Sequence, residues 1–183
     1  MLNELRHDFR RISKGKPSVF AILWFFMVRA GFRAVILYRL GHSLRKNRFR
    51  LSAAIVERIM HHACHCYIST AANIGRGFMI AHVGGIVIGS GVTIGTNCDV
   101  RQNVTLGGNF NRKSDDGLTQ PVIANNVSLG VGAVVVGPIR IGPNTIIGAN
   151  SVVTRDMPGD SIVAGIPAAV VKARWNQTDG RSL

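Results

Sequence analysis

The second half of the chain carries aliphatic residues at steps of six, most of them followed by Gly or another small residue. These positions are Ile74, Ile80, Ile88, Ile94, Val100, Leu106, Ile123, Leu129, Val135, Ile141, Ile147 and Val153. An α-helix needs apolar steps of three and four, so it cannot use a period of six. The period fits a short strand and a turn repeated three times per coil, with the aliphatic side chain pointing inward. The pattern therefore predicts a parallel β-helix with a packed aliphatic core.

Two interruptions of this pattern predict features at the corners of the coils. Between Ile80 and Ile88 the spacing is two residues longer than the pattern requires, which predicts a bulge or an insertion beside His82. The segment 109–120 is polar and contains a glycine, so it predicts a loop that leaves one corner. We expect the coils to run from about residue 68 to residue 163.

The residues before the hexads predict helices instead. A basic helix is expected over 2–15, and a strongly apolar helical region over 18–46 with a break near Gly31. A third helix is expected over 51–65. Its apolar positions are Ala54, Ile55, Ile59 and Met60.

The chain therefore divides into three parts. An α-helical N-terminal segment spans 1–66, the β-helix domain spans 67–171, and a polar C-terminal tail spans 172–183. The composition, 46% hydrophobic and 17% charged, fits a globular protein and argues against disorder. The three cysteines are an odd number without a disulfide framework, so we expect a reducing cytoplasm.

Positive charge is concentrated at the start of the chain. The formal net charge is +13, and residues 1–50 hold twelve Lys or Arg against Glu4 and Asp8, a difference of ten. Such a segment suits phosphates, an anionic polymer or an anionic membrane. It lacks the interleaved aromatic and basic pattern of a nucleic-acid module, so we expect no nucleic-acid partner.

The longest apolar run, 19–28, lies inside this basic segment. Ten residues are too few to span a bilayer, and cleavage there as a signal peptide would remove half of a helical unit. Two interpretations stay open. The run packs against neighbouring subunits, or it rests on the inner face of a membrane through its apolar side and its basic flanks. The second interpretation predicts peripheral membrane contact through residues 1–50.

A cluster of metal-ligand residue types spans 61–66, where the sequence reads His-His-Ala-Cys-His-Cys. His61 and His65 would share a helix face, and two thiolates follow closely. The cluster lacks a paired Cys-x-x-Cys element and straddles the junction of helix and coil. We therefore expect no metal ion.

Five segments together resemble the serine O-acetyltransferases, in order and over roughly residues 2–172. They are Gly31-Phe-Arg-Ala-Val-Ile-Leu-Tyr-Arg-Leu-Gly-His42, Ala71-Ala-Asn-Ile-Gly-Arg-Gly77 with Ile80-Ala-His-Val-Gly-Gly-Ile-Val-Ile-Gly89, Gln102-Asn-Val-Thr-Leu-Gly-Gly108, and Ala164-Gly-Ile-Pro-Ala168. The resemblance implies a hexapeptide-repeat acyltransferase with a left-handed β-helix. It further implies a homotrimer, with acetyl-CoA as co-substrate in the groove between neighbouring prisms.

The resemblance also assigns candidate catalytic residues. His82 occupies the position of the catalytic base, and a neutral imidazole accepts a proton near pH 7. Tyr67 stands where the family has the acid that orients this His. Gln120 replaces a second family His, and it serves either as a hydrogen-bond partner of an uncharged acceptor or as a solvated loop residue.

Further positions are assigned to acetyl-CoA. Gly107 and Gly108 let backbone approach the thioester, where an amide is a candidate oxyanion donor. Val131 and Ala149 would flank the pantetheine arm. Lys172, with Arg174 beside it in the sequence, is a candidate for the CoA phosphates, although a solvated basic tail is the simpler interpretation.

Several departures from the family bear on the acceptor. Ala81 and Thr119-Gln120 replace an Asp and an Arg-His pair, and Lys16 aligns with an Asp near the N-terminus. Serine presents an ammonium and a carboxylate, and a site for it should keep matching charges. We therefore expect the acyl donor to be retained and the acceptor to be a sugar hydroxyl in exopolysaccharide or surface-glycan synthesis, including a lipid-linked glycan. L-Serine is the alternative acceptor, and an inactive CoA-binding trimeric scaffold is the alternative of another class.

Overall fold

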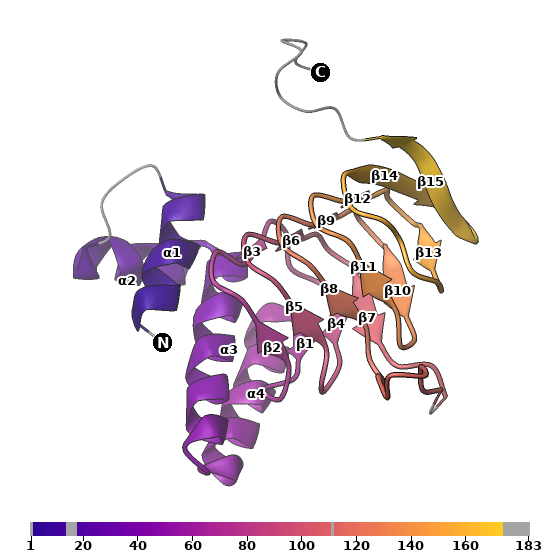
Figure 1. Cartoon of the computed structure of the whole chain (residues 1–183). Helices are drawn as coiled ribbons and strands as arrows, with labels where there is room; N and C mark the ends of the chain where they lie inside the picture. The colour runs from indigo at the N-terminus through magenta and orange to yellow at the C-terminus, as the bar shows by residue number, and fades with distance from the viewer. Residues whose placement is uncertain (1, 14–17, 111, 174–183) are drawn as a thin grey trace.

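The computed structural model describes residues 2–13, 18–110 and 112–173, and it shows helices followed by a parallel β-helix (Figure 1). The described helices are α1 (Leu2–Ile12), α2 (Val19–Val28), α3 (Ala30–Lys46) and α4 (Arg50–Cys64). This order of elements confirms the predicted fold class. The end of the predicted helix 2–15 lies partly outside the described residues.

Successive strands fall in turn on three parallel sheets, so each coil is a three-sided turn of the prism. The first sheet contains β1 (Cys66–Ile68), β4 (Ile86–Ile88), β7 (Thr105–Gly107), β10 (Val134–Val136) and β13 (Val152–Val153). The second contains β2 (Asn73–Ile74), β5 (Thr93–Ile94), β8 (Val122–Ile123) and β11 (Arg140–Ile141). The third contains β3 (Met79–Ile80), β6 (Asp99–Val100), β9 (Ser128–Leu129), β12 (Ile146–Ile147), β14 (Ser161–Gly165) and β15 (Ala168–Ala173).

The aliphatic hexad positions form the core of the prism. All twelve are buried, from Ile74 at 6% exposure to Val153 at 0%. The strand register stacks each aliphatic residue on the equivalent residue of the next coil, as Ile88 pairs with Leu106 and Leu106 with Val135. The predicted inward direction of the hexad residues is therefore confirmed.

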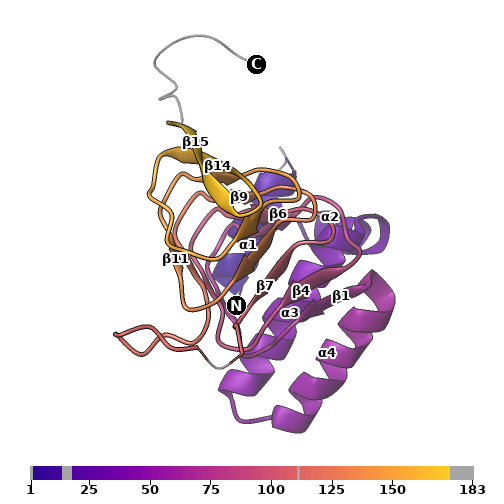
Figure 2. The same ribbon diagram turned by 90° about the vertical axis from the view of Figure 1, so that its right-hand side faces the viewer.

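Both predicted interruptions are present at corners. Residues 81–85 form bends between β3 and β4. The described residues between β7 and β8, 108–110 and 112–121, contain no strand, and this connection projects beyond the outline of the coils (Figure 2). Within the described residues, β15 runs antiparallel to β14, so Ala168–Ala173 do not continue the parallel coils.

The helical segment differs from expectation in two details. The break in the apolar region is at Arg29, two residues before Gly31, and it bends α2 against α3 by 113°. The buried side of α4 consists of Ala53, Val56, Met60 and Cys64. Of the four apolar positions that the sequence pattern indicated for this helix, at 54, 55, 59 and 60, only Met60 is buried. Both sides of α4 are apolar, so the sequence pattern alone did not show which side faces α3.

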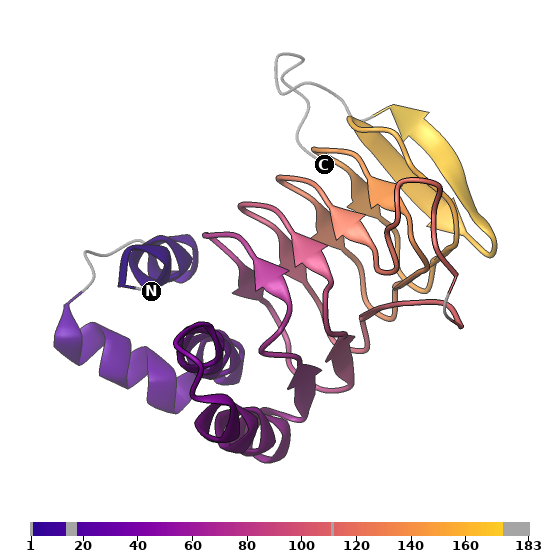
Figure 3. The ribbon, with the colours of Figure 1, turned by 60° about the horizontal axis from the view of Figure 1, so that its bottom comes forward.

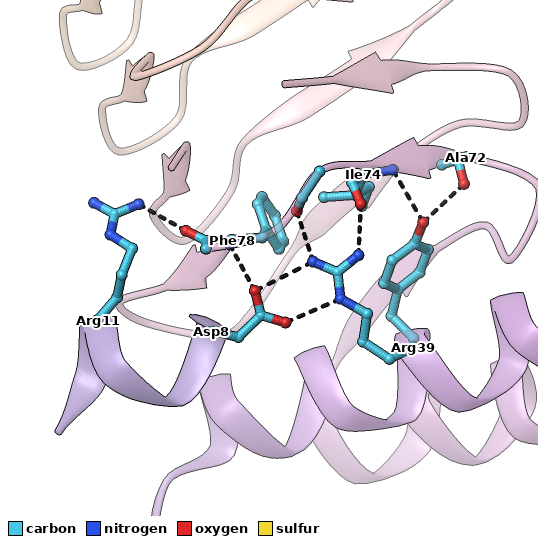
Figure 4. A network of polar contacts seen from close by, with 9 residues as sticks. Asp8, Arg11, Arg39, Ala72, Ile74 and Phe78 are labelled. Carbon is cyan, nitrogen blue, oxygen red and sulfur yellow. Dashed lines mark hydrogen bonds and ion pairs between the residues drawn. The ribbon is translucent and has the colours of Figure 1, made fainter. Parts of the chain in front are cut away.

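Side chains from α3 bond to the backbone of the first coil (Figure 4). The Tyr38 hydroxyl donates to the carbonyl oxygen of Ala72 at 2.8 Å and accepts from the amide of Ile74 at 3.1 Å. The Arg39 guanidinium donates to the carbonyl oxygens of Ile74 and Gly75. In later coils, backbone groups at equivalent positions form hydrogen bonds with the preceding coil. The first coil has no preceding coil, so α3 supplies the hydrogen-bond partners.

The Arg39 guanidinium is itself paired inside the protein. Asp8 of α1 accepts from it at 2.9 Å, and the Asp8 carboxylate also accepts from the amide of Phe78 at 2.9 Å. Both side chains are buried, at 0% exposure for Asp8 and 3% for Arg39. Arg11, one turn along α1, donates to the carbonyl oxygen of Gly77 at 2.8 Å. One buried ion pair therefore joins α1, α3 and the first coil.

No single helix in the described part of the chain has the length and hydropathy to cross a membrane. The bent pair of α2 and α3 passes that test only when the two helices are taken together.

Candidate functional site

His82 lies exposed in the bend between β3 and β4, where the extra residues of the hexad pattern are inserted. The neighbouring Ala81 amide donates to the carbonyl oxygen of Val100 at 3.1 Å, which fixes the start of the bend on the next coil. The N-terminal turn of α3 supports the other side. A Cβ at Gly31 would lie 2.1 Å from the carbonyl oxygen of Ile80, so only glycine allows this contact.

A cavity of about 490 Å³ opens beside His82. It is lined by the end of α1, the junction of α2 and α3, and residues 79–83, and none of its twelve lining residues is acidic. Arg29 lines the cavity, and so does Arg11, whose guanidinium lies 3.6 Å from Asp99. The cavity has the size of a small-molecule site, and its charged walls are basic.

Tyr67 lies on β1 and is 44% exposed. The Glu57 carboxylate on α4, with a smaller effect of burial, raises the pKa of the Tyr67 hydroxyl, which hydrogen-bonds to Glu57. Glu57 also accepts from the amide of Thr70 at 2.8 Å, which holds the carboxylate in place. An acid therefore lies beside Tyr67, supplied by α4 and not by the strand that carries the tyrosine. The sequence analysis did not identify Glu57, because the contact depends on how α4 packs on the first coil.

One edge of the prism joins the bend of His82 to two of the positions predicted for acetyl-CoA. Along this edge the amide of Asn103 donates to Gly84, that of Gly132 to Gln102, and that of Asn150 to Val131. Val131 is half-buried, and the neighbouring Ala149 is exposed one coil further along. His82, Val131 and Ala149 therefore follow the same edge, between the third sheet and the first.

The remaining predicted positions follow the next edge, between the first sheet and the second. Gly107 ends β7, and a Cβ at Gly108 would lie 2.8 Å from the Nε2 atom of Gln120. The Gln120 side chain also lies close to Gly91, which follows β4. Its Oε1 atom is buried and has no hydrogen-bond partner within the described protein. A polar atom in that state is suited to accept a hydrogen bond from a bound group.

The predicted site is therefore divided between two edges of one chain. His82 precedes β4, whereas Gln120 packs near residues that follow β4, so the width of the first sheet separates them. A single chain does not bring these two side chains together.

Of three further positions considered in the sequence, the structure describes only one. Lys172 is exposed on β15, in register with Ile162 of β14. Arg174 and Lys16 lie outside the described residues.

The cluster 61–66 does not have the arrangement expected for a metal site. The helix α4 ends at Cys64, and His65 follows with a left-handed backbone, so His61 and His65 do not share a helix face. Within the residues that the structure describes, no three His, Cys, Asp or Glu side chains gather around one point. Cys64, Cys66 and Cys98 are buried free thiols, and burial raises the pKa of Cys66 and of Cys98.

Comparison with known proteins places this architecture in a family. Residues 120–155 match the family model described as bacterial transferase hexapeptide (six repeats). A serine acetyltransferase of Synechococcus elongatus is 37% identical over 171 residues, which covers 93% of this chain and 69% of the relative.

Two solved structures agree. Neisseria gonorrhoeae serine acetyltransferase superposes with a TM-score of 0.84 at 30% identity, over 96% of this chain and 66% of that one. A serine acetyltransferase in complex with CoA superposes with a TM-score of 0.78 at 32% identity, over 93% of this chain and 69% of that one. The present chain thus spans about two thirds of the length of these proteins. It belongs to the serine acetyltransferase family, within the hexapeptide-repeat acyltransferases.

Proposed function

We propose that the protein transfers an acetyl group from acetyl-CoA to a hydroxyl group, with His82 as the general base. The observation that carries this proposal is the position of His82: it stands exposed at a prism edge, inside the family motif, beside a cavity of about 490 Å³. The solved relative with bound CoA supports acetyl-CoA as the donor. We expect the reaction in the cytoplasm, where acetyl-CoA is available.

The reaction requires one proton acceptor and one oxyanion site. A ring nitrogen of His82 takes the proton of the acceptor hydroxyl as its oxygen attacks the thioester carbon. We assign the stabilisation of the negative charge that develops on the carbonyl oxygen to a backbone amide at Gly107 or Gly108, on the edge that a neighbouring copy of the chain would present. When the tetrahedral intermediate collapses, the carbon–sulfur bond breaks, and the imidazolium returns its proton to the CoA thiolate. The products are the acetyl ester and CoA.

The division of the site between two edges supports a homotrimer. If three prisms pack side by side, the edge with His82 on one chain faces the edge with Gln120 on its neighbour. The groove between them would then hold acetyl-CoA, with Val131 and Ala149 along the pantetheine arm. Sedimentation velocity of the purified protein tests this arrangement, and a monomer that is fully active would contradict it.

Two acceptors compete, and each is supported by a different observation. The names of the relatives favour L-serine, which we take as the first acceptor to test. The cavity favours a neutral sugar hydroxyl as the second, because Ala81 leaves its wall without an acid for the serine ammonium. The comparisons therefore support the serine alternative better than the glycan acceptor expected from the sequence.

Release of free CoA thiol, measured with L-serine as the sole acceptor, distinguishes these candidates. The His82→Ala variant should lose about 10²- to 10⁴-fold in rate. His62→Ala, which removes an exposed imidazole from α4, is the matched control and should keep full activity. Turnover that depends on His82 would establish the serine reaction. Binding of acetyl-CoA without turnover would direct the search to sugar acceptors, and turnover that is unchanged in His82→Ala would disprove the catalytic role.

A further inference from the structure

The outer side of α2 is an apolar surface that nothing in the described chain covers. Its six large side chains are each more than half exposed: Val19 (77%), Phe20 (79%), Leu23 (59%), Trp24 (58%), Met27 (70%) and Val28 (51%). Successive members of this set are alternately one and three positions apart, which places all six on one continuous side of the helix. We call these six residues the α2 face.

The α2 face is held outward by the packing of the opposite side. The Phe25 ring meets the rings of Phe9 in α1 and Phe32 in α3 edge-on, with centroids 5.2 Å and 6.3 Å apart. These contacts fix the rotation of α2, so the α2 face cannot turn inward. The helix lies at the outside of the helical end of the molecule, far from β15 (Figures 1 and 3). A helix that is apolar all round is ordinarily buried, so a further surface must cover this side.

We propose that the α2 face docks on an anionic lipid membrane, with α2 lying in the plane of the interface. The helix has ten residues, which at 1.5 Å per residue is about 15 Å and too short to cross a bilayer. Most helices that rest at the headgroup level have a charged face of their own, whereas α2 has none. The basic groups that meet the headgroups would therefore come from the residues beside it. Trp24 is the residue type that prefers this depth.

The charge around α2 favours a lipid surface over a second copy of the chain. By sequence count residues 1–50 hold twelve Lys or Arg against Glu4 and the buried Asp8, although the four at positions 45–50 lie at or beyond the end of α3 that is far from α2. Arg29 is exposed directly after α2, and Arg6 and Arg10 are exposed on α1, which packs beside it. Two copies joined through this side would bring like charges together, whereas anionic headgroups complement them.

Docking in this orientation would have a consequence for the reaction. Val28 and Arg29 end α2 and also line the cavity beside His82. The cavity would therefore lie beside the docked helix, close to where a lipid-linked acceptor is anchored. This consequence rests on the proposed function, but membrane binding itself does not.

Vesicle flotation with the full-length protein tests the proposal directly. We expect binding to vesicles that contain phosphatidylglycerol, and weaker binding to pure phosphatidylcholine or at high salt. The double variant Phe20→Glu with Trp24→Glu should lose about tenfold or more of the binding. Val170→Glu with Val171→Glu, the same double change at exposed apolar positions on β15, should bind like the unchanged protein. Circular dichroism checks that each variant is folded.

Tryptophan fluorescence gives a second readout that does not depend on activity. The chain has two tryptophans, so Trp175→Phe leaves Trp24 as the only one. Its emission should shift to shorter wavelength with phosphatidylglycerol vesicles.

Absence of vesicle binding, or equal binding by the double variant, would overturn the proposal. The proposal would also be overturned if the unchanged protein bound no vesicles and formed an oligomer that dissociates in the double variant. A second copy would then cover the α2 face. Thiol release with a soluble acceptor should stay unchanged in the double variant, which separates this proposal from the proposed reaction.

Discussion

The β-helix and the helices before it are held together by different kinds of contact. Inside the prism, each coil repeats the contacts of the last, with an aliphatic core and backbone hydrogen bonds between equivalent residues. At the junction with the helices, no contact is repeated. A few polar side chains, chiefly Asp8, Tyr38 and Arg39, each bond to particular backbone atoms of the first coil.

This difference predicts different responses to substitution. In the coils, a change at one core position affects neighbouring coils that still hold one another, as in other repeat architectures. At the junction, the removal of one side chain leaves its buried partners without alternatives.

The largest effect is expected at the buried ion pair. Arg39→Met leaves the Asp8 carboxylate buried without its cation, and the free energy of unfolding should fall by about 3–5 kcal/mol. Urea unfolding followed by circular dichroism measures the change. Arg45→Met, at an exposed position of the same helix, is the control and should be nearly neutral. Combining Asp8→Leu with Arg39→Met should recover much of the loss. If Arg39→Met and Arg45→Met have the same free energy of unfolding, the ion pair does not hold the junction.

A core position of the coils should give a comparable or somewhat smaller effect. Ile94→Ala removes a side chain that is 2% exposed, and the expected loss is about 2–5 kcal/mol. Its neighbour Thr93 points out of the coil, so Thr93→Ala should change stability by no more than about 0.5 kcal/mol. Similar losses at both positions would contradict the assigned direction of the hexad residues.

Tyr38 makes the stability of the junction depend on pH. Burial raises its pKa from 10.0 to about 12, so the folded state binds the phenolic proton more tightly than the unfolded state. The corresponding stabilisation is complete below about pH 10 and is lost as the pH rises through about 12. It amounts to roughly 2–3 kcal/mol. Thermal unfolding between these pH values should show this loss in the native sequence and not in Tyr38→Phe.

The smallest effect is expected for Glu57, which faces Tyr67 near the predicted site. Glu57→Gln keeps an oxygen for the Thr70 amide but removes the charge beside the tyrosine. The pKa of Tyr67 should fall toward 10.0, because the carboxylate is the main cause of its increase. The chain has two tyrosines, so ultraviolet titration in a Tyr38→Phe background reports Tyr67 alone. If Tyr67 orients His82, kcat/KM should fall about tenfold in Glu57→Gln. An unchanged kcat/KM with a shifted pKa would assign Glu57 a local role only.

Much of the β-helix could be predicted from the sequence because its signal is periodic. Each hexad repeats the same requirement. The inward residues, the bend beside His82 and the loop predicted over 109–120 all follow from where the six-residue spacing holds and where it is interrupted. The ends of the helices were predicted less exactly. The break at Arg29 and the buried side of α4 depend on packing between helices that are apolar on both sides.

The junction and the details of the site could not be predicted in the same way. Asp8 meets Arg39 across 31 residues, and Arg39 reaches Gly75 across 36. No periodicity marks such a pair. Glu57 was missed for the same reason, since its relation to Tyr67 appears only when α4 lies on the first coil. The separation of His82 and Gln120 follows from the sheet topology, which the family resemblance alone does not give.

The partners that the helices provide for the first coil also affect how copies of the protein can meet. A β-helix that ended in bare backbone would offer a template on which another chain could stack, coil upon coil, into a fibre. Here Tyr38 and Arg39 occupy carbonyl oxygens of the first coil that such a stack would need, and at the other end the antiparallel return of β15 covers the edge of the third sheet. The same contacts that hold the helices in place therefore protect the protein against end-to-end polymerisation.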